Sequence, residues 1–136
     1  MAHTLNLTKL EEGEAHATFH YFMKSDGASG ELSAQTLVDP TTDFSPVLTA
    51  GQRMIVKHIW YEVYGFNLTF LFGSSGTNWP FWVLTPGVNS EHDWRYFGGI
   101  KDTAPATPNG KLLITTAGFA TATSLGSFVI RVEKRP

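Results

Sequence analysis

Hydrophobic and polar positions between residues 51 and 100 fall into short segments that end at turn-forming residues. The segments are rich in β-branched and aromatic side chains, and Gly65, Gly73 and the Pro86-Gly87 pair separate them. This pattern is typical of consecutive short strands. It predicts strands over 51–64, 66–72, 79–84 and 91–97.

Strict alternation within these segments predicts which side chains share a face. In the second strand it predicts an inward row made of Phe66, Leu68, Phe70 and Phe72. In the first strand it places Ile55, Lys57, Ile59, Tyr61 and Val63 on one face, and Met54, Val56, His58, Trp60, Glu62 and Tyr64 on the other. Both faces are largely apolar, as in a strand at the middle of a sandwich with a loop or interface over its outer face. Pro80 indicates either that the third strand lies at a sheet edge or that the proline is among the first residues of that strand.

Residues 14–24 fit two periodicities. At a period of two, one face carries Ala15, Ala17, Phe19, Tyr21 and Met23; at helical spacing, Ala15, Phe19, Phe22 and Met23 align. We favour a strand, because the Asp26-Gly27 turn signal follows and the surrounding segments are rich in β-formers.

The remaining segments complete an all-β pattern. Further strands are expected over 4–10, 31–38, 111–116 and 127–133, with loops over 40–50 and 101–110. The total is eight or nine strands with little or no helix. We therefore predict a single domain over 1–136 that folds as an antiparallel β-sandwich of jelly-roll type.

Composition narrows the classes of function. The chain has no cysteine, which excludes disulfides, thiolate metal sites and a cysteine nucleophile. Its net charge is −2 and its Lys and Arg residues are dispersed, so we expect no nucleic-acid partner. The sequence shows no signal peptide and no apolar run near the ~20 residues of a membrane helix. Charged residues make up only 16% and aromatic residues 13%, which suggests a surface covered by a partner.

The polar residues do not form a catalytic pattern, so we expect no enzymatic activity, cofactor or metal. On a strand, His16 and His20 would lie about 13 Å apart, too far to share one ion, although helical spacing would suit a metal. His92 and Asp93 could be two members of a catalytic triad with Ser74 or Ser75. However, these serines lie in a Gly-Ser-Ser-Gly turn and not in a nucleophile elbow.

The aromatic residues are the candidates for a binding surface. Trp79, Trp82, Trp94 and Tyr96 are suited to stacking on sugar rings or to anchoring a protein interface, or they fill the core. Trp79 and Trp82 are three positions apart, so in a regular strand only one of them can face the core. Arg95, between two rings and ahead of a glycine pair, suits a carboxylate of a partner or is a solvent-exposed strand arginine.

Several segments share turns and strand ends with one group of proteins. They are Lys24-Ser25-Asp26-Gly27, Gly30-Glu31-Leu32, Leu37-Val38-Asp39, Ile59-Trp60-Tyr61, Leu84-Thr85-Pro86-Gly87, Asp93-Trp94-Arg95-Tyr96-Phe97-Gly98-Gly99-Ile100 and Leu113-Ile114-Thr115-Thr116-Ala117-Gly118-Phe119. In this order, and over most of the chain, they resemble small tailed-phage capsid decoration proteins.

The resemblance implies a head decoration or cement protein that is made in the host cytoplasm and binds the major capsid protein on the virion surface. Such a protein can also associate with itself as a homotrimer, since capsid lattices offer threefold positions. Lacing between subunits would have to come from residues 1–8 or 131–136. The alternative is a carbohydrate- or receptor-binding sandwich, such as a fibre tip or lectin-like module, with Trp79, Trp82 or Trp94 exposed in a groove.

Overall fold

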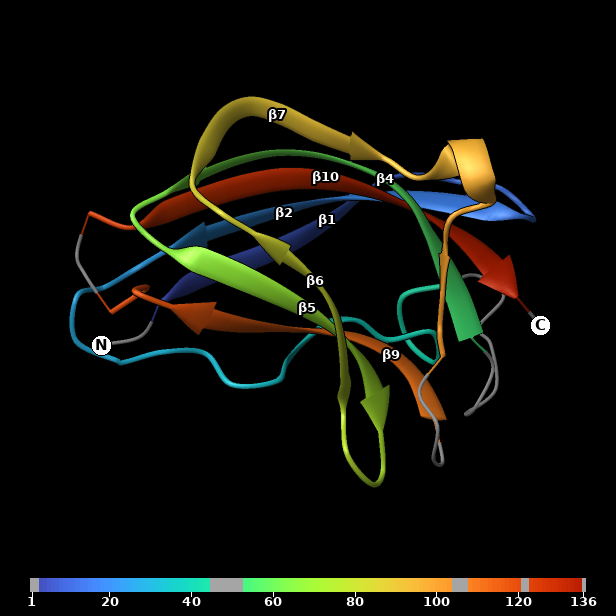
Figure 1. The fold of residues 1–136 in the computed structure, drawn as a ribbon, viewed down its shortest axis with the longest axis horizontal. Coiled ribbons are helices and arrows are strands. Elements are labelled where there is room, and N and C mark those ends of the chain that lie inside the picture. The colour runs from blue at the N-terminus through green and yellow to red at the C-terminus, as the bar shows by residue number, and fades with distance from the viewer. Residues whose placement is uncertain (1–2, 45–52, 104–107, 121–122, 136) are drawn as a thin grey trace.

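The computed structural model describes residues 3–44, 53–103, 108–120 and 123–135, which form two antiparallel sheets packed as a sandwich (Figure 1). One sheet has six strands: β1 (Thr4–Glu12), β2 (His16–Lys24), β10 (Leu125–Arg135), β4 (Arg53–Tyr64) and β7 (Gly87–Asp93), in that order, with β8 (Ile100–Lys101) also paired to β4. The other sheet has the order β3 (Gln35–Val38), β9 (Pro108–Ala117), β5 (Asn67–Ser74) and β6 (Trp79–Leu84). The 3-10 turn η1 (Arg95–Phe97) follows β7.

The strand prediction for residues 14–24 is confirmed. Residues 16–24 form β2, and the alternate side chains Ala17, Phe19, Tyr21 and Met23 are buried against the opposite sheet. The row predicted for 66–72 is also confirmed, since Phe66, Leu68, Phe70 and Phe72 are all buried. Pro80 is the second residue of β6, which is an edge strand, so both alternatives predicted for this proline are met. Burial of a shared apolar face therefore decides between the two periodicities.

The structure corrects the predicted number of strands, the start of the strand predicted over 31–38 and the extent of the loop predicted over 101–110. Among the described residues there are ten strands rather than eight or nine. Residues 31–34 are not in a strand, because the hydroxyls of Thr116 and Thr115 accept the N–H groups of Leu32 and Ala34 in place of backbone carbonyls. The predicted 101–110 loop is shorter, since β8 and β9 take residues from both of its ends. Of the loop predicted over 40–50, residues 45–50 lie outside the described part of the chain.

The face assignment within β4 is wrong for its first half. A β-bulge at Lys57 puts one extra residue opposite the Arg131–Val132 step of β10. Side chains on either side of a bulge change their alternation. As a result Met54 and Val56 are buried in the core together with Ile59, instead of lying on the opposite face from it.

Aromatic side chains from both sheets form the centre of the core. The Phe128 ring of β10 packs against Tyr21 of its own sheet, with centroids 5.4 Å apart, and edge-on against Phe70 of the other sheet at 5.7 Å. Edge-to-face pairs add to the free energy gained from apolar burial. Phe128 is thus a contact point between the two layers.

We expect Phe128→Ala to lower the free energy of unfolding by about 3–5 kcal/mol, because it opens a cavity between the sheets. Val83→Ala, which truncates a side chain on the outside of β6, should cost less than about 1 kcal/mol. Urea denaturation of both variants measures the difference. Equal losses in the two variants would contradict this account of the core.

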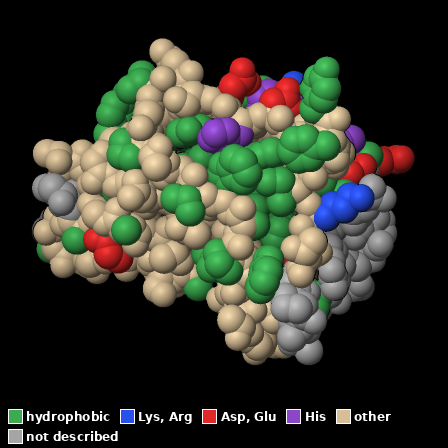
Figure 2. Space-filling view, viewed as in Figure 1, with side chains coloured by type: hydrophobic (Ala, Val, Ile, Leu, Met, Phe, Trp, Pro, Cys, Tyr) green, Lys and Arg blue, Asp and Glu red, His purple; other side chains and the backbone are tan. Residues whose placement is uncertain are grey.

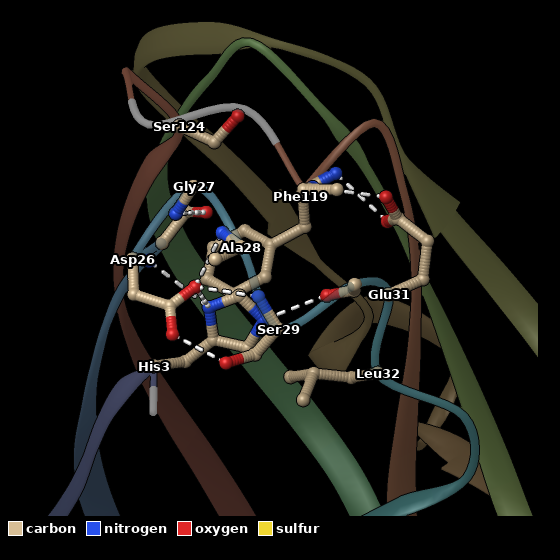
Figure 3. Close-up of polar contacts among 12 residues, drawn as sticks. His3, Asp26, Gly27, Ala28, Ser29, Glu31, Leu32, Phe119 and Ser124 are labelled. Atoms are coloured by element: carbon tan, nitrogen blue, oxygen red, sulfur yellow. Dashed lines mark hydrogen bonds and ion pairs between the residues drawn. The ribbon is translucent and has the colours of Figure 1, made fainter. Parts of the chain in front are cut away.

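Polar contacts hold the loop after β2 against the start of β1 (Figure 3). The His3 ring donates from Nε2 to the Gly30 carbonyl at 2.6 Å and accepts the Asp26 N–H at Nδ1 at 3.1 Å. The His3 ring also packs against the Phe119 ring, with centroids 4.7 Å apart. Hydrogen bonds from the Ser29 hydroxyl and the N–H groups of residues 28 and 29 hold the pKa of Asp26 well below its usual range.

Glu31 ties the same loop to the turn after β9. Its carboxylate accepts hydrogen bonds from the N–H groups of Phe119 and Ala120 at 2.8 and 2.9 Å and from the Thr116 hydroxyl at 2.9 Å. Partial burial acts to raise the pKa of Glu31, but these three donors outweigh it and lower the pKa below its usual value. The ionised carboxylate therefore stabilises the fold.

We expect acidification to weaken this connection. Because folding lowers the pKa values of Asp26 and Glu31, their contribution is complete above the unfolded-state values near 4 and is lost as the pH falls below them. Glu31→Gln should lower the melting temperature at pH 7 and reduce its fall between about pH 5 and pH 3. The exposed Glu14→Gln is the control and should match the unmodified chain in a thermal scan. A Glu31→Gln curve parallel to that of the unmodified chain at every pH would refute the mechanism.

Candidate functional site

Four aromatic rings close the gap between the two sheets at the β6–β7 side of the sandwich. Trp82 of β6 packs edge-on against Trp94 at 5.0 Å and against His92 of β7 at 5.2 Å. His92 also stacks on Tyr61 of β4 at 5.4 Å, and its Nε2 lies 3.2 Å from the Tyr61 hydroxyl. In Figure 2 hydrophobic side chains form a band on this side of the molecule, with a histidine beside it. The cluster joins residues that are 33 positions apart, from 61 to 94.

A β-bulge in β6 decides the direction of its tryptophans. Trp82 lies opposite Phe70 and Trp79 opposite Phe72, so three steps along β6 match two along β5. The extra residue is Phe81, whose ring stacks on Phe72 with centroids 4.0 Å apart. The premise of a regular strand is therefore wrong. Trp82 is half-buried over the core, whereas Trp79 near the strand end is 42% exposed.

The strand predicted over 91–97 ends at Asp93, and the chain then forms the η1 turn. The Trp94 N–H donates to the Lys57 carbonyl at 3.0 Å, and the Lys57 amine donates to the Gly98 carbonyl at 3.0 Å. Gly98 and Gly99 both have positive φ, at 87° and 91°, which reverses the chain toward β8. The bulged residue of β4 therefore fixes the turn from both sides.

Arg95 is paired within its own chain. Its guanidinium donates from Nε and one terminal nitrogen to the two oxygens of Asp93 at 2.9 and 2.8 Å, and its N–H donates to the same carboxylate at 3.0 Å. The side-chain and backbone hydrogen bonds from Arg95 hold the pKa of Asp93 well below its usual range. This bidentate pair fastens the start of η1.

The turn presents two aromatic side chains to solvent. Tyr96 is fully exposed and Phe97 is 68% exposed, and we call this pair the η1 tip. In Figure 2 a group of hydrophobic side chains projects at the upper right, where Figure 1 draws η1. Tyr96 is one of the predicted interface residues, whereas Phe97 is not, because a strand over 91–97 would turn alternate side chains inward. The Phe-Gly-Gly sequence after Arg-Tyr was the available signal of a turn.

The structure separates the five candidate residues into three environments. Trp94 is buried at 3% exposure and supports the turn from beneath. Trp82 packs on it and is half-buried, while Trp79 lies exposed at the far end of β6. Arg95 and Tyr96 are exposed at η1. A buried Trp94 does not offer a stacking face to a sugar, so Trp79 and Tyr96 remain as the exposed aromatic residues of the predicted set.

The described residues contain no group of three or more His, Asp or Glu side chains that could hold a metal ion. His16 and His20 both lie in β2 and are four residues apart along this strand, as the strand interpretation expects. Within the part of the chain that the structure covers, no helix has the length and hydrophobicity needed to cross a bilayer.

The fold and these surfaces define an all-β sandwich protein with exposed aromatic residues. The chain matches no protein-family model, no curated protein and no solved structure.

The η1 turn provides a matched pair of glycine substitutions. A Cβ on Gly98 meets no atom within 4 Å, whereas a Cβ on Gly99 would lie 2.5 Å from Ile55 Cγ2 and 2.9 Å from the Val56 carbonyl oxygen. Gly98→Ala should therefore cost about 1–2 kcal/mol for its left-handed backbone alone. Gly99→Ala should cost more, because it also forces η1 away from β4. Guanidinium denaturation compares the two, and equal costs would show that η1 does not pack tightly on β4.

Proposed function

We propose that this chain is a structural protein of a phage virion, a capsid decoration protein that binds the outer surface of the major capsid protein lattice. The observation that carries the proposal is the η1 tip, in which Tyr96 and Phe97 project from a turn held by backbone hydrogen bonds. The segments that resemble phage decoration proteins include this turn.

The geometry of the tip favours a macromolecular partner. Exposed aromatic side chains supply much of the binding free energy at protein interfaces, and they do so best when they enter a pocket of the partner. Because η1 is already fixed by Lys57 and by the Asp93–Arg95 pair, little conformational entropy would be lost on docking. A projecting, pre-organised tip suits insertion into a pocket of a large assembly.

The first and last strands of the described chain are paired within the six-stranded sheet, which supports docking through the tip. Residues 4–12 are paired with β2 along β1, and residues 125–135 are paired on both sides along β10. Both segments that could have laced subunits together are thus held in the sheet over these residues. The contact with the lattice would come from a preformed surface.

We also propose that the sandwich has jelly-roll connectivity, as expected for viral capsid-associated domains. The strand orders β2-β10-β4-β7 and β3-β9-β5-β6 support this proposal. Along the chain, the connections that cross from one sheet to the other are β2–β3, β3–β4, β4–β5, β6–β7, β8–β9 and β9–β10. This alternation is what two interlocked Greek keys require.

The test measures occupancy on purified heads that were assembled without the protein. We expect Tyr96→Ala/Phe97→Ala to reduce bound copies at least tenfold, because loss of an interface hot spot costs about 2 kcal/mol or more. Leu10→Ala is the matched control, since it removes an exposed apolar side chain from β1, and it should bind normally. Arg95→Ala should give an intermediate loss by loosening the turn.

Mass-spectrometric copy number completes the test. A decoration protein should be present in hundreds of copies per particle, set by the capsid lattice. A handful of copies would indicate a tail or fibre component and refute the proposal. Normal occupancy of the Tyr96/Phe97 double variant would refute the docking surface.

A further inference from the structure

A groove of about 350 Å³ crosses three strands of the six-stranded sheet. Its walls and floor come from β7, β4 and β10, and it shares no residue with the η1 tip. The lining residues are Trp60, Tyr61, Glu62, Asn89, Ser90, Glu91, Ser127, Phe128 and Val129. This volume is at the lower end of the range for small-ligand sites, which have volumes of roughly 300–1,000 Å³.

Trp60 forms the apolar part of this groove, and one face of its ring packs against His58. Its ring is 42% exposed and stacks on His58, with centroids 3.8 Å apart and an interplanar angle of 28°. His58 is itself only 2% exposed, and its Nε2 is bonded to Glu91 Oε2 at 2.6 Å. The indole therefore has a fixed orientation, with one face covered by a buried ring and the rest available to a ligand.

Polar side chains around Trp60 have hydrogen-bonding capacity to spare. Glu62 and Asn89 make no side-chain hydrogen bond with the described part of the chain, and Glu91 uses only one of its oxygens on His58. Ser127 contributes a hydroxyl that His20 holds at 2.9 Å. Asn89 has a positive φ of 53° at a bulge in β7, where three steps match two of β4. Bulges redirect side chains beside functional sites.

We propose that this groove binds a neutral saccharide. A sugar ring has an apolar C–H face, which suits the Trp60 indole, and a rim of hydroxyls, which suits the carboxylates of Glu62 and Glu91 and the amide of Asn89. Charge-assisted bonds to the carboxylates would be the stronger ones. None of the described residues that line the groove is Lys or Arg, so the carboxylates of Glu62 and Glu91 would disfavour an anionic sugar or a phosphate.

A basic side chain of a protein partner is the competing occupant, because a cation also suits Trp60 and two carboxylates. Because a Lys or Arg side chain only donates hydrogen bonds, it would leave the N–H groups of the Asn89 amide and the hydroxyl protons of Ser90 and Ser127 without an acceptor. The mixture of acceptors and donors therefore favours a polyol. The two occupants also differ in their response to salt, since exposed ion pairs weaken as ionic strength rises.

The experiment is a screen of the purified full chain against an array of neutral and anionic glycans, followed by titration of the best neutral glycan. We expect Trp60→Ala to weaken binding tenfold or more, as loss of an aromatic anchor does. Glu62→Gln should weaken binding several-fold. Trp79→Ala is the matched control, because Trp79 is also 42% exposed but lies in the other sheet, and it should bind as the unmodified chain does.

Three results would overturn the proposal: no neutral glycan bound, binding retained in both Trp60→Ala and Glu62→Gln, or saturable binding of a lysine-rich peptide that falls steeply with salt. Glu62→Gln keeps the test decisive if Trp60→Ala does not fold, because that substitution removes no hydrogen bond of the described chain. Head occupancy of Trp60→Ala and Glu62→Gln should be normal, so failure here and failure of the capsid proposal are distinguishable.

Discussion

The structure depends on the contact between two rows of aromatic side chains, one from each sheet. Neither sheet is stable with its apolar face in water, and the Phe128–Phe70 contact lies where the two faces meet. Every strand must therefore present one side to this core, and the period of two follows along most of each strand. The positions of the η1 tip and of the groove at Trp60 depend on where the strands keep this alternation and where they depart from it.

Three of the departures in the described strands are β-bulges that each lie next to a surface with a candidate role. The bulge at Lys57 provides the carbonyl and amine that fix η1. The bulge at Phe81 brings Trp82 over the core edge, where it covers Trp94. The bulge before Ser90 places Asn89 at the wall of the groove. An extra residue in one strand costs a ladder hydrogen bond, but it directs a side chain that regular alternation would turn elsewhere.

The four tryptophans have different roles, so their number does not measure a binding surface. Trp94 is structural, Trp82 packs on it, and Trp60 and Trp79 are each 42% exposed. Sequence reasoning placed Trp79, Trp82 and Trp94 among the binding candidates and left Trp60 within a strand. It could not identify Trp60 as a groove residue, because the groove also needs Glu91 and Ser127, which lie on neighbouring strands 31 and 67 positions further along the chain.

Alternation and turn residues are local signals, so they were enough to predict the all-β class, most strand positions and the inward row from Phe66 to Phe72. The sequence also indicated, through Pro80, that β6 lies at a sheet edge or begins near this proline. Tertiary contacts, in contrast, determine that Trp94 is buried and that Phe97 is exposed. These outcomes depend on bulges and on the docking of η1 against β4. Both arise from contacts between distant segments, which a local pattern of hydrophobic and polar residues does not encode.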